Sequence, residues 1–461
     1  MAVIVWLWLG RRDPLLHLVP VALAFPPLMA YGGPALGWPG GWLSTRVALV
    51  ACIALSLLFR VARRDFSYYS IPGMWFVAPY LLLVFASVLW GVLGPYNSEA
   101  GVIANELLSW VILVTLFLCI AGSAQGEGDL KRASQMLFGV GFGIAVYSGF
   151  QALALIGNTQ LVPTPIANLT QYGRENLLFA PYRLYGTLPN VGPNFFGAFV
   201  LVPTILAFSR AYSERRLVRI SWVLAGLVGV AMIVGTYSRG AMLGVVVALV
   251  MLPLWRRSLR GMASMVATLS VLAVGVAQTP VGRHVASLYA AGQFDVSGSA
   301  RVYLWKAILK SSAEHPLGLG FDGWPRESRI NLSVGLADIP TSIGTEHPAE
   351  NQWMRELADR GIPGVLALAL LLGGFARVTF VQADPRRSSG YSRDVLVATG
   401  AASVGWAVIL LTGDHLTYDN VAGMFWYMMA LSLAATRDNM QMVEPTHSSS
   451  TPGFSLATRH R

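Results

Sequence analysis

A histidine stands in the stretch GTEHPAENQWMRELADRGIPG, residues 344–364, among neighbours that could tune it for proton transfer. Proline favours the first position of a helix, so Pro348 predicts that His347 caps a helix. That helix is predicted to run to Arg360, with Gly361 as its stop. An imidazole at a helix N-terminus faces the positive end of the helix dipole, which disfavours its protonated form. A neutral imidazole can accept a proton, so His347 is a candidate general base.

The protonation state of His347 is left open by its acidic neighbours, because Glu346 and Glu350 favour the charged ring. The tripeptide Glu-His-Pro also occurs at residues 314–316, where the proline ends a predicted helix and leads into glycines. His315 in that copy is interpreted as structural. For His347 we favour a catalytic or acceptor-binding role, with helix capping as the alternative.

A second candidate is Arg239 in the stretch TYSRGA, a turn of about two residues between two apolar runs. The planar guanidinium matches a phosphate or diphosphate bidentately. Ser238 can donate a hydrogen bond or cap the following helix, and Gly240 would let the backbone approach a ligand closely. The alternative is a side chain that anchors a helix end in the lipid headgroup layer. We favour anion binding.

The elements that position these residues are membrane helices. The chain has 461 residues, of which 54% are hydrophobic and 12% charged. Apolar runs of about 20 residues are long enough to cross ~30 Å of hydrocarbon, which excludes a soluble globular protein. The sequence predicts an all-α polytopic membrane protein. About twelve spans are predicted, at about residues 14–33, 42–59, 72–94, 103–122, 132–157, 191–209, 217–236, 239–254, 261–279, 361–380, 395–413 and 418–436.

Basic residues cluster in alternate connections between these spans, which predicts that both termini are cytoplasmic. These basic connections form a collar that would face anionic lipid headgroups. The collar explains the net charge of +10, so a nucleic-acid partner is not needed. Cys52 and Cys119 fall inside spans and indicate neither a disulfide framework nor a metal site. The predicted organisation is nine spans in 1–279 with an outward loop at 158–190, a large outward loop with the active-site helix at 280–360, three spans in 361–436 and a disordered cytoplasmic tail at 437–461.

Basic residues are rare on the outward side, the side opposite the basic collar. They occur there as Arg174 and Arg183 in the first long loop, as Arg239, and around Arg301 in the second long loop. His347 is predicted to lie on the same side. Basic residues in short loops favour the cytoplasmic side, so an arginine in a short outward turn is unexpected. Its presence there indicates that Arg239 has a function.

The second long loop contains SGSARVYLWKAILKSSAEHPLGLGFDGW, which predicts an amphipathic helix that begins at Ser297 or Ser299 and ends by Pro316. One side of this helix is predicted to be apolar and to carry Val302, Leu304, Trp305, Ile308 and Leu309. The stretch GLGFDG that follows matches GxGxxG in its letters. No apolar strand precedes it and a proline follows it, so it is interpreted as a turn and not as a nucleotide site.

Three stretches, TYSRGAMLG, RVYLWKAILKSSAEHPLGLGFDGW and EHPAENQWMRELADRGIPG, resemble in their order the O-antigen ligase and polymerase superfamily. The earlier stretch PYRLYGTLPNVGPNFFGAF is similar to the segment with an arginine followed by Pro-Asn in many members. The resemblance covers about residues 180 to 380. It implies a C-type glycosyltransferase fold in the bacterial inner membrane, with no nucleotide sugar, no metal and no other cofactor.

The resemblance also implies the reaction and the residues. A glycan on undecaprenyl diphosphate moves to an acceptor hydroxyl on the periplasmic face, and the lipid diphosphate leaves. By position, Arg239 holds the diphosphate, Arg183 and Arg301 also contact it, and His347 activates the acceptor hydroxyl. The family histidine is here followed by Pro348 and not directly by a polar residue. The candidate supporting residues are Ser238, Glu346, Glu350 and Asn351.

Several functions stay open at this point. Within the superfamily we favour a ligase that attaches O-antigen to lipid A–core. A polymerase of O-antigen or exopolysaccharide repeat units and a protein O-glycosylating enzyme are alternatives. A transporter or flippase of lipid-linked sugar would carry charged or broken helices near the middle of the membrane, whereas the predicted spans are nearly free of charge, with Arg46 close to an end. A scaffolding role leaves the outward arginines unexplained.

Overall fold

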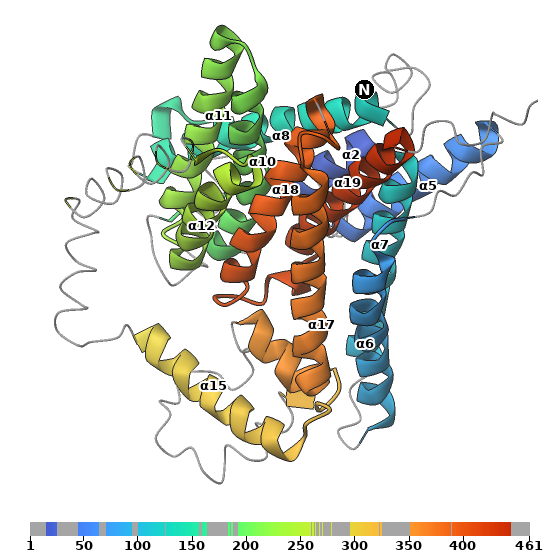
Figure 1. Cartoon of the computed structure of the whole chain (residues 1–461). Helices are drawn as coiled ribbons and strands as arrows, with labels where there is room; N and C mark the ends of the chain where they lie inside the picture. The colour runs from blue at the N-terminus through green and yellow to red at the C-terminus, as the bar shows by residue number, and fades with distance from the viewer. Residues whose placement is uncertain are drawn as a thin grey trace, which may run out of the picture.

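The computed structural model describes residues 15–24, 45–63, 71–94, 100–124, 126–155, 159–163, 183–184, 186–187, 192–259, 296–321, 323–324, 351–388 and 390–443, together with 261, 263, 267, 270 and 278. Within these residues every regular element is a helix and no β-strand is present, which confirms the predicted all-α class (Figure 1). The helices are α2 (Leu15–Ala24), α5 (Thr45–Arg63), α6 (Met74–Leu93), α7 (Ala100–Ser123), α8 (Gly126–Leu155), η1 (Thr159–Leu161), α10 (Pro193–Ser213), α11 (Arg216–Gly235), α12 (Arg239–Trp255), α15 (Val296–Glu314), α17 (Gln352–Gln382), α18 (Gly390–Ile409), η2 (His415–Thr417) and α19 (Asp419–Val443).

Six of the described helices, α6, α7, α8, α10, α11 and α17, are long and apolar enough to cross a membrane. Helices α5 and α12 contain shorter apolar stretches, Arg46–Leu58 and Arg239–Trp255. The chain is therefore a multi-pass membrane protein, but the predicted count of about twelve spans is not confirmed. The predicted span at 261–279 lies mostly outside the described residues, as does the second part of the span at 14–33.

Two predicted spans, 395–413 and 418–436, form helices α18 and α19, which do not reach the hydropathy of the other six. Most of their described side chains are buried by neighbouring helices, and buried polar groups such as Asp394 and Arg437 lie among them. A helix enclosed by other helices presents little surface to lipid, so it can carry polar side chains that find partners inside the protein.

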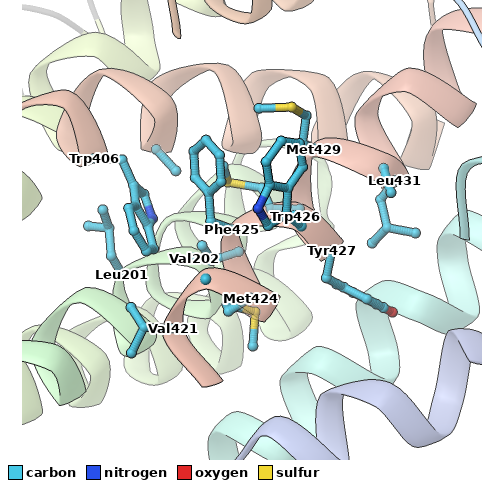
Figure 2. Packing of buried hydrophobic residues seen from close by; sticks show 14 of the residues in the cluster. Leu201, Val202, Trp406, Val421, Met424, Phe425, Trp426, Tyr427, Met429 and Leu431 are labelled. Atoms are coloured by element: carbon cyan, nitrogen blue, oxygen red, sulfur yellow. The ribbon is translucent and has the colours of Figure 1, made fainter. Parts of the chain in front are cut away.

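Helices α18 and α19 form a buried centre of the bundle. Helix α18 packs on α10, α12 and α17, and α19 packs on α7 and α18. Figure 2 shows the rings of Trp406, Phe425 and Trp426 in this centre; the ring centroid of Phe425 lies 5.1 Å from that of Trp406 and 5.7 Å from that of Trp426. Lipid tails are as apolar as these side chains, so close packing between helices holds the bundle together.

Glycines let α12 and α18 approach closely. A Cβ atom added at Gly405 would lie 2.6 Å from the carbonyl oxygen of Gly244. Small residues at such a crossing allow backbone contact between membrane helices. This contact fixes the N-terminal end of α12, which carries Arg239, relative to the turn that joins α18 and α19.

Part of the basic collar predicted from the sequence is internal. The side chain of Asp394 is fully buried and forms ion pairs with Arg210 of α10 and with Arg256, which caps the C-terminal end of α12. Ser209 donates a hydrogen bond to the backbone carbonyl of Asp394 at 2.9 Å. These two arginines therefore join three helices through a carboxylate and do not serve only to face lipid headgroups.

Helix α17 consists of two helices with a break at Gly361, where φ is 64° and ψ is −158°. The predicted stop at this glycine is confirmed. The predicted start at Pro348 is wrong, because the helix begins at Gln352 with Asn351 as its N-cap. The Asn351 side chain accepts hydrogen bonds from the backbone N–H groups of Trp353 and Met354, at 2.9 and 3.3 Å. These two accepted bonds make Asn351 the N-cap of α17, where the sequence predicted the cap at position 347.

The glycine-rich stretch after α15 is a turn, as predicted, and it packs on the break in α17. Gly318 and Gly320 have φ values of 85° and 83°, which side chains rarely adopt. A Cβ atom at Gly318 would lie 2.5 Å from the backbone nitrogen of Gly361. Backbone hydrogen bonds hold the contact, from Leu319 N–H to Ala358 O, from Gly320 N–H to Asp359 O and from Ile362 N–H to Pro316 O, at 2.8, 2.9 and 3.0 Å.

Helix α15 lies beside the first part of α17, on which the glycine-rich turn packs (Figure 1). It begins at Val296, close to the predicted serines, and ends before Pro316. The prediction of one apolar side is wrong in part. Leu304 and Ile308 are buried, whereas Val302 and Leu309 are 44% and 53% exposed. Leu304 and Ile308 are four positions apart and share one face, while Val302 and Leu309 are seven apart and share another.

The chain end differs from the prediction of a disordered tail at 437–461, because α19 continues to Val443. The buried Arg437 side chain donates hydrogen bonds to the backbone carbonyls of Ala121 and Ala124, the first at 3.0 Å. Since these carbonyls lie at the end of α7, the arginine joins α19 to α7. The remainder of the tail lies outside the described residues.

We predict that Gly318→Ala lowers the midpoint of thermal unfolding, because the new methyl group would strain a positive φ and press on the backbone of α17. The expected loss of stability is about 2 kcal/mol or more. Gly373→Ala is the matched control, because no atom lies within 4 Å of a Cβ atom added there. Its midpoint should be equal to or above that of the wild type. Intrinsic tryptophan fluorescence of the detergent-solubilised variants measures both; equal midpoints would contradict the assignment of this turn.

Candidate active site

Arg183 is anchored to the turn that precedes α12. Its Nε donates to the carbonyl oxygen of Thr236 at 2.7 Å, and its Nη2 donates to Oδ1 of Asn194 at 2.7 Å. The next backbone N–H, that of Leu184, donates to the carbonyl oxygen of Gly235 at 2.9 Å. Both acceptors of the guanidinium are uncharged, so these bonds orient Arg183 without neutralising it.

The turn between α11 and α12 has a defined local structure. Ser238 caps α12, since its side chain accepts a hydrogen bond from the backbone N–H of Ala241 at 3.3 Å. This confirms the capping role predicted for Ser238. The preceding residue, Tyr237, has a φ of 51°, which is uncommon for a residue with a side chain. The turn thereby places Arg239 as the first residue of α12, with an exposed side chain.

Two arginines from distant parts of the sequence, Arg239 and Arg301, lie near Arg183. Burial lowers the pKa of Arg183, and the positive charges of Arg239 and Arg301 lower it further. Each guanidinium therefore lies within electrostatic range of Arg183, although α15 and α12 are separate elements. Like charges held together in a partly buried place favour the binding of an anion. The sequence predicted these residues for one site, and the structure brings them together.

Gly240 has a different role from the predicted one. A Cβ atom added there would lie 1.7 Å from Oγ1 of Thr412. The space next to this glycine is therefore filled by the turn after α18, and the glycine serves helix packing. The side of Gly240 where a Cβ atom would stand therefore faces Thr412 and not a ligand.

The N-terminal end of α17 docks on the same turn after α18. The backbone N–H of Gln352 donates to the carbonyl oxygens of Leu410 and Gly413, at 2.8 and 3.2 Å. In return, the Gln352 side chain accepts from the backbone N–H of Leu416 at 3.2 Å. Asn351 and the N-terminal end of α12 thus border one turn, residues 410–418. His347, Glu346, Glu350 and Arg174 lie outside the described residues.

A buried polar network behind this docking site was not predicted. Glu356 is fully buried and accepts hydrogen bonds from Tyr80 Oη and Gln352 Nε2, both at 2.8 Å. It also forms an ion pair with Arg360. Tyr80 lies inside the apolar helix α6, whereas Glu356 and Arg360 precede the predicted span at 361–380, so the network joins a membrane helix to the segment before that span. The charged groups compensate one another within one hydrogen-bonded network.

Two further polar residues of the site region were missed in the sequence. Asp414 forms an ion pair with Arg355 at 3.2 Å, and His415 follows it in η2. Both lie in TGDHLTYDN, a short polar stretch between two predicted spans on the outward side. That placement was the available signal. His315, by contrast, directly follows α15, and its carbonyl oxygen accepts from the N–H of Gly318 at 2.9 Å.

Residues 223–369 match the family model described as O-antigen ligase. The chain contains an O-antigen ligase domain. This confirms the resemblance to the O-antigen ligase and polymerase superfamily and, with the apolar helices, identifies a membrane enzyme of this general type. No curated protein matches the chain.

The O-antigen ligase domain contributes only part of the described site. The matched range includes Arg239, Arg301 and Asn351. Arg183, Asn194 and the 410–418 turn lie outside it and reach the site through the packing of α10 and α18. Asn194 was part of the Pro-Asn segment noted in the sequence, without a role. The structure gives it one as the partner of Arg183.

Proposed function

We propose that the protein transfers a glycan from undecaprenyl diphosphate to an acceptor hydroxyl on the periplasmic face of the inner membrane, as a ligase that joins O-antigen to lipid A–core. The observation that carries this proposal is that Arg239 and Arg301 both lie within electrostatic range of Arg183. Both termini are proposed to be cytoplasmic, which puts these arginines on the periplasmic side.

The arginines would act on the leaving group. When the bond between the anomeric carbon and the diphosphate oxygen breaks, negative charge develops on the diphosphate. Fixed guanidinium groups in a place with little water stabilise that charge more strongly than water does. Arg183 uses two of its five N–H groups for its anchors, so others remain for phosphate oxygens. Ser238 would position Arg239 by capping its helix.

His347 is the proposed base. The acceptor hydroxyl oxygen would attack the anomeric carbon while the imidazole takes the hydroxyl proton, and the diphosphate leaves with the bonding electrons. Asn351 is fixed beside the 410–418 turn, and His347 precedes it by four residues. Four residues extend at most about 14 Å, which supports the choice of His347 as the base. Glu346 and Glu350 are proposed to support the ring.

A transporter of lipid-linked sugar is the second candidate, and one feature favours it. Broken helices and charged groups inside spans are typical of transporters, and α17 has both the break at Gly361 and the buried pair of Glu356 and Arg360. These charges are satisfied by each other and by Tyr80, and the break orients the helix that Asn351 caps. The O-antigen ligase domain also favours the transferase.

We predict that purified wild-type protein transfers glycan from undecaprenyl diphosphate to lipid A–core, and that Arg239→Lys and Arg239→Ala are impaired in that order. Lysine keeps the charge but loses the planar donor pair. A charge-assisted hydrogen bond contributes roughly 1.5–3 kcal/mol, so Arg239→Ala should lose about tenfold to hundredfold in turnover. Arg216→Lys, which changes an exposed arginine at the opposite end of α11, is the control and should be fully active.

The acceptor in this assay separates the candidate functions. Growth of the glycan on a second lipid-linked repeat unit, with lipid A–core unused, would mean a polymerase. No product with either acceptor, together with glycan-lipid movement across proteoliposomes, would mean a transporter. Wild-type turnover by Arg239→Lys would show that this arginine serves only as a membrane anchor.

The twin histidines give an internal comparison. We predict that His347→Ala abolishes transfer while the protein reaches the membrane in normal amount, because the acceptor hydroxyl loses its base. His315→Ala should keep substantial activity, since His315 lies in the turn after α15. Turnover per mole of purified protein measures both. Equal losses in two well-folded variants would refute the proposed role of His347.

A further inference from the structure

His415 is a buried histidine whose ring nitrogens form no regular hydrogen bond within the described part of the chain. Its side chain is 1% exposed, in the short helix η2. Among the described residues, neither ring nitrogen has a hydrogen-bond partner. Buried polar atoms in native proteins are nearly always hydrogen-bonded, so an exception requires an explanation such as a missing ligand or water.

The ring lies among aromatic side chains. Its centroid is 4.7 Å from that of Phe195 and 6.4 Å from that of Trp406, both in edge-to-face arrangements. A Cβ atom added at Gly413 would lie 2.6 Å from Nε2, so only glycine leaves room for the ring. An apolar side chain would satisfy such surroundings better than an imidazole does, which indicates that the nitrogens are needed.

The ring is uncharged at neutral pH. Burial lowers the pKa of His415 to about 4, although the charge of Asp414 and a weak hydrogen-bonding contact with the Ile409 carbonyl, short of a regular hydrogen bond, partly oppose the shift. A neutral imidazole has one N–H donor and one nitrogen acceptor. It can therefore exchange two hydrogen bonds with a hydroxyl group, which also donates and accepts. Phosphate oxygens only accept, and the arginines already supply donors for them.

His415 lies where the segments of the candidate site meet. Phe195, which contacts the ring, directly follows Asn194, the partner of Arg183. Gly413, on the other side of the ring, accepts a hydrogen bond from the backbone of Gln352, next to Asn351. The turn that carries His415 also packs on α12 beside Arg239, through Thr412. The unused nitrogens are therefore close to the proposed sites of the donor and of the base.

We propose that His415 is a substrate-binding residue that hydrogen-bonds a sugar hydroxyl, supplied by either the donor glycan or the acceptor. This inference rests on the proposed transferase function. The ring is enclosed, so the hydroxyl reaches it when Phe195 moves. Phe195 and Tyr418, whose ring centroids are 4.2 Å apart, are both partly exposed on this side. Stacking of the sugar on these rings would accompany the hydrogen bond.

The test compares His415→Phe with His415→Gln in the purified enzyme. Phenylalanine fills the space without nitrogen atoms, while glutamine keeps a neutral donor and acceptor. We expect His415→Phe to lose roughly tenfold in kcat/KM, through a higher KM, with an unfolding midpoint at or above that of the wild type. His415→Gln should recover part of that loss. The KM that rises, for the lipid-linked donor or for the acceptor, identifies which substrate supplies the hydroxyl.

Other outcomes overturn the proposal. A His415→Phe enzyme with wild-type kcat and KM would mean that the ring only packs, or that a buried water satisfies its nitrogens. A His415→Gln enzyme as impaired as His415→Phe would also refute the hydrogen bond. Should His415→Phe fail to fold, His415→Met takes its place with the same expected loss. Lack of turnover by the wild type would count against the proposed function, whereas an active wild type with an active His415→Phe variant counts against His415 alone.

Discussion

The repulsion between arginines is the constraint on which this site depends. Arg183, Arg239 and Arg301 come from three segments, yet Arg183 feels the charge of the other two. Hydrogen bonds from Arg183 to Thr236 and Asn194 hold its guanidinium in place despite that repulsion. An anion bound among these groups would relieve the repulsion, so its binding free energy would add to the stability of the folded chain. Occupation of the proposed site would therefore stabilise the packing around it.

The broken helix α17 begins five residues after the proposed base in the sequence. Its first part is fixed from both ends, by the docking of Gln352 on the 410–418 turn and by the glycine turn that packs on Gly361. Glu356 ties the same part to Tyr80 within the membrane helix α6. Rigid support of this kind keeps reacting groups in position, which contributes to catalysis by reducing the entropy lost on reaching the transition state.

Local features of this fold could be predicted from sequence, and long-range ones could not. Apolar runs locate helices such as α6 within two residues of the predicted 72–94, and the cap at Ser238 follows from local chemistry. Asn351 is also a local capping signal, but Pro348 offers a competing helix start three residues earlier, and sequence alone does not rank the two. The anchoring of Arg183 by Asn194, the pairing of Glu356 with Tyr80 and the burial of His415 depend on packing between helices far apart in sequence. The hydrophobic periodicity and the motif spacing of the sequence do not predict such contacts.

The central claim is that the arginine cluster binds a diphosphate, and calorimetric titration of the purified wild-type protein tests it most directly. The titrants are a soluble short-chain prenyl diphosphate and the corresponding monophosphate. The account predicts one diphosphate bound per chain, at least tenfold more tightly than the monophosphate, with an increase in unfolding temperature. Equal affinity for the two lipids, or a diphosphate affinity that is unchanged in Arg183→Gln, would contradict the account.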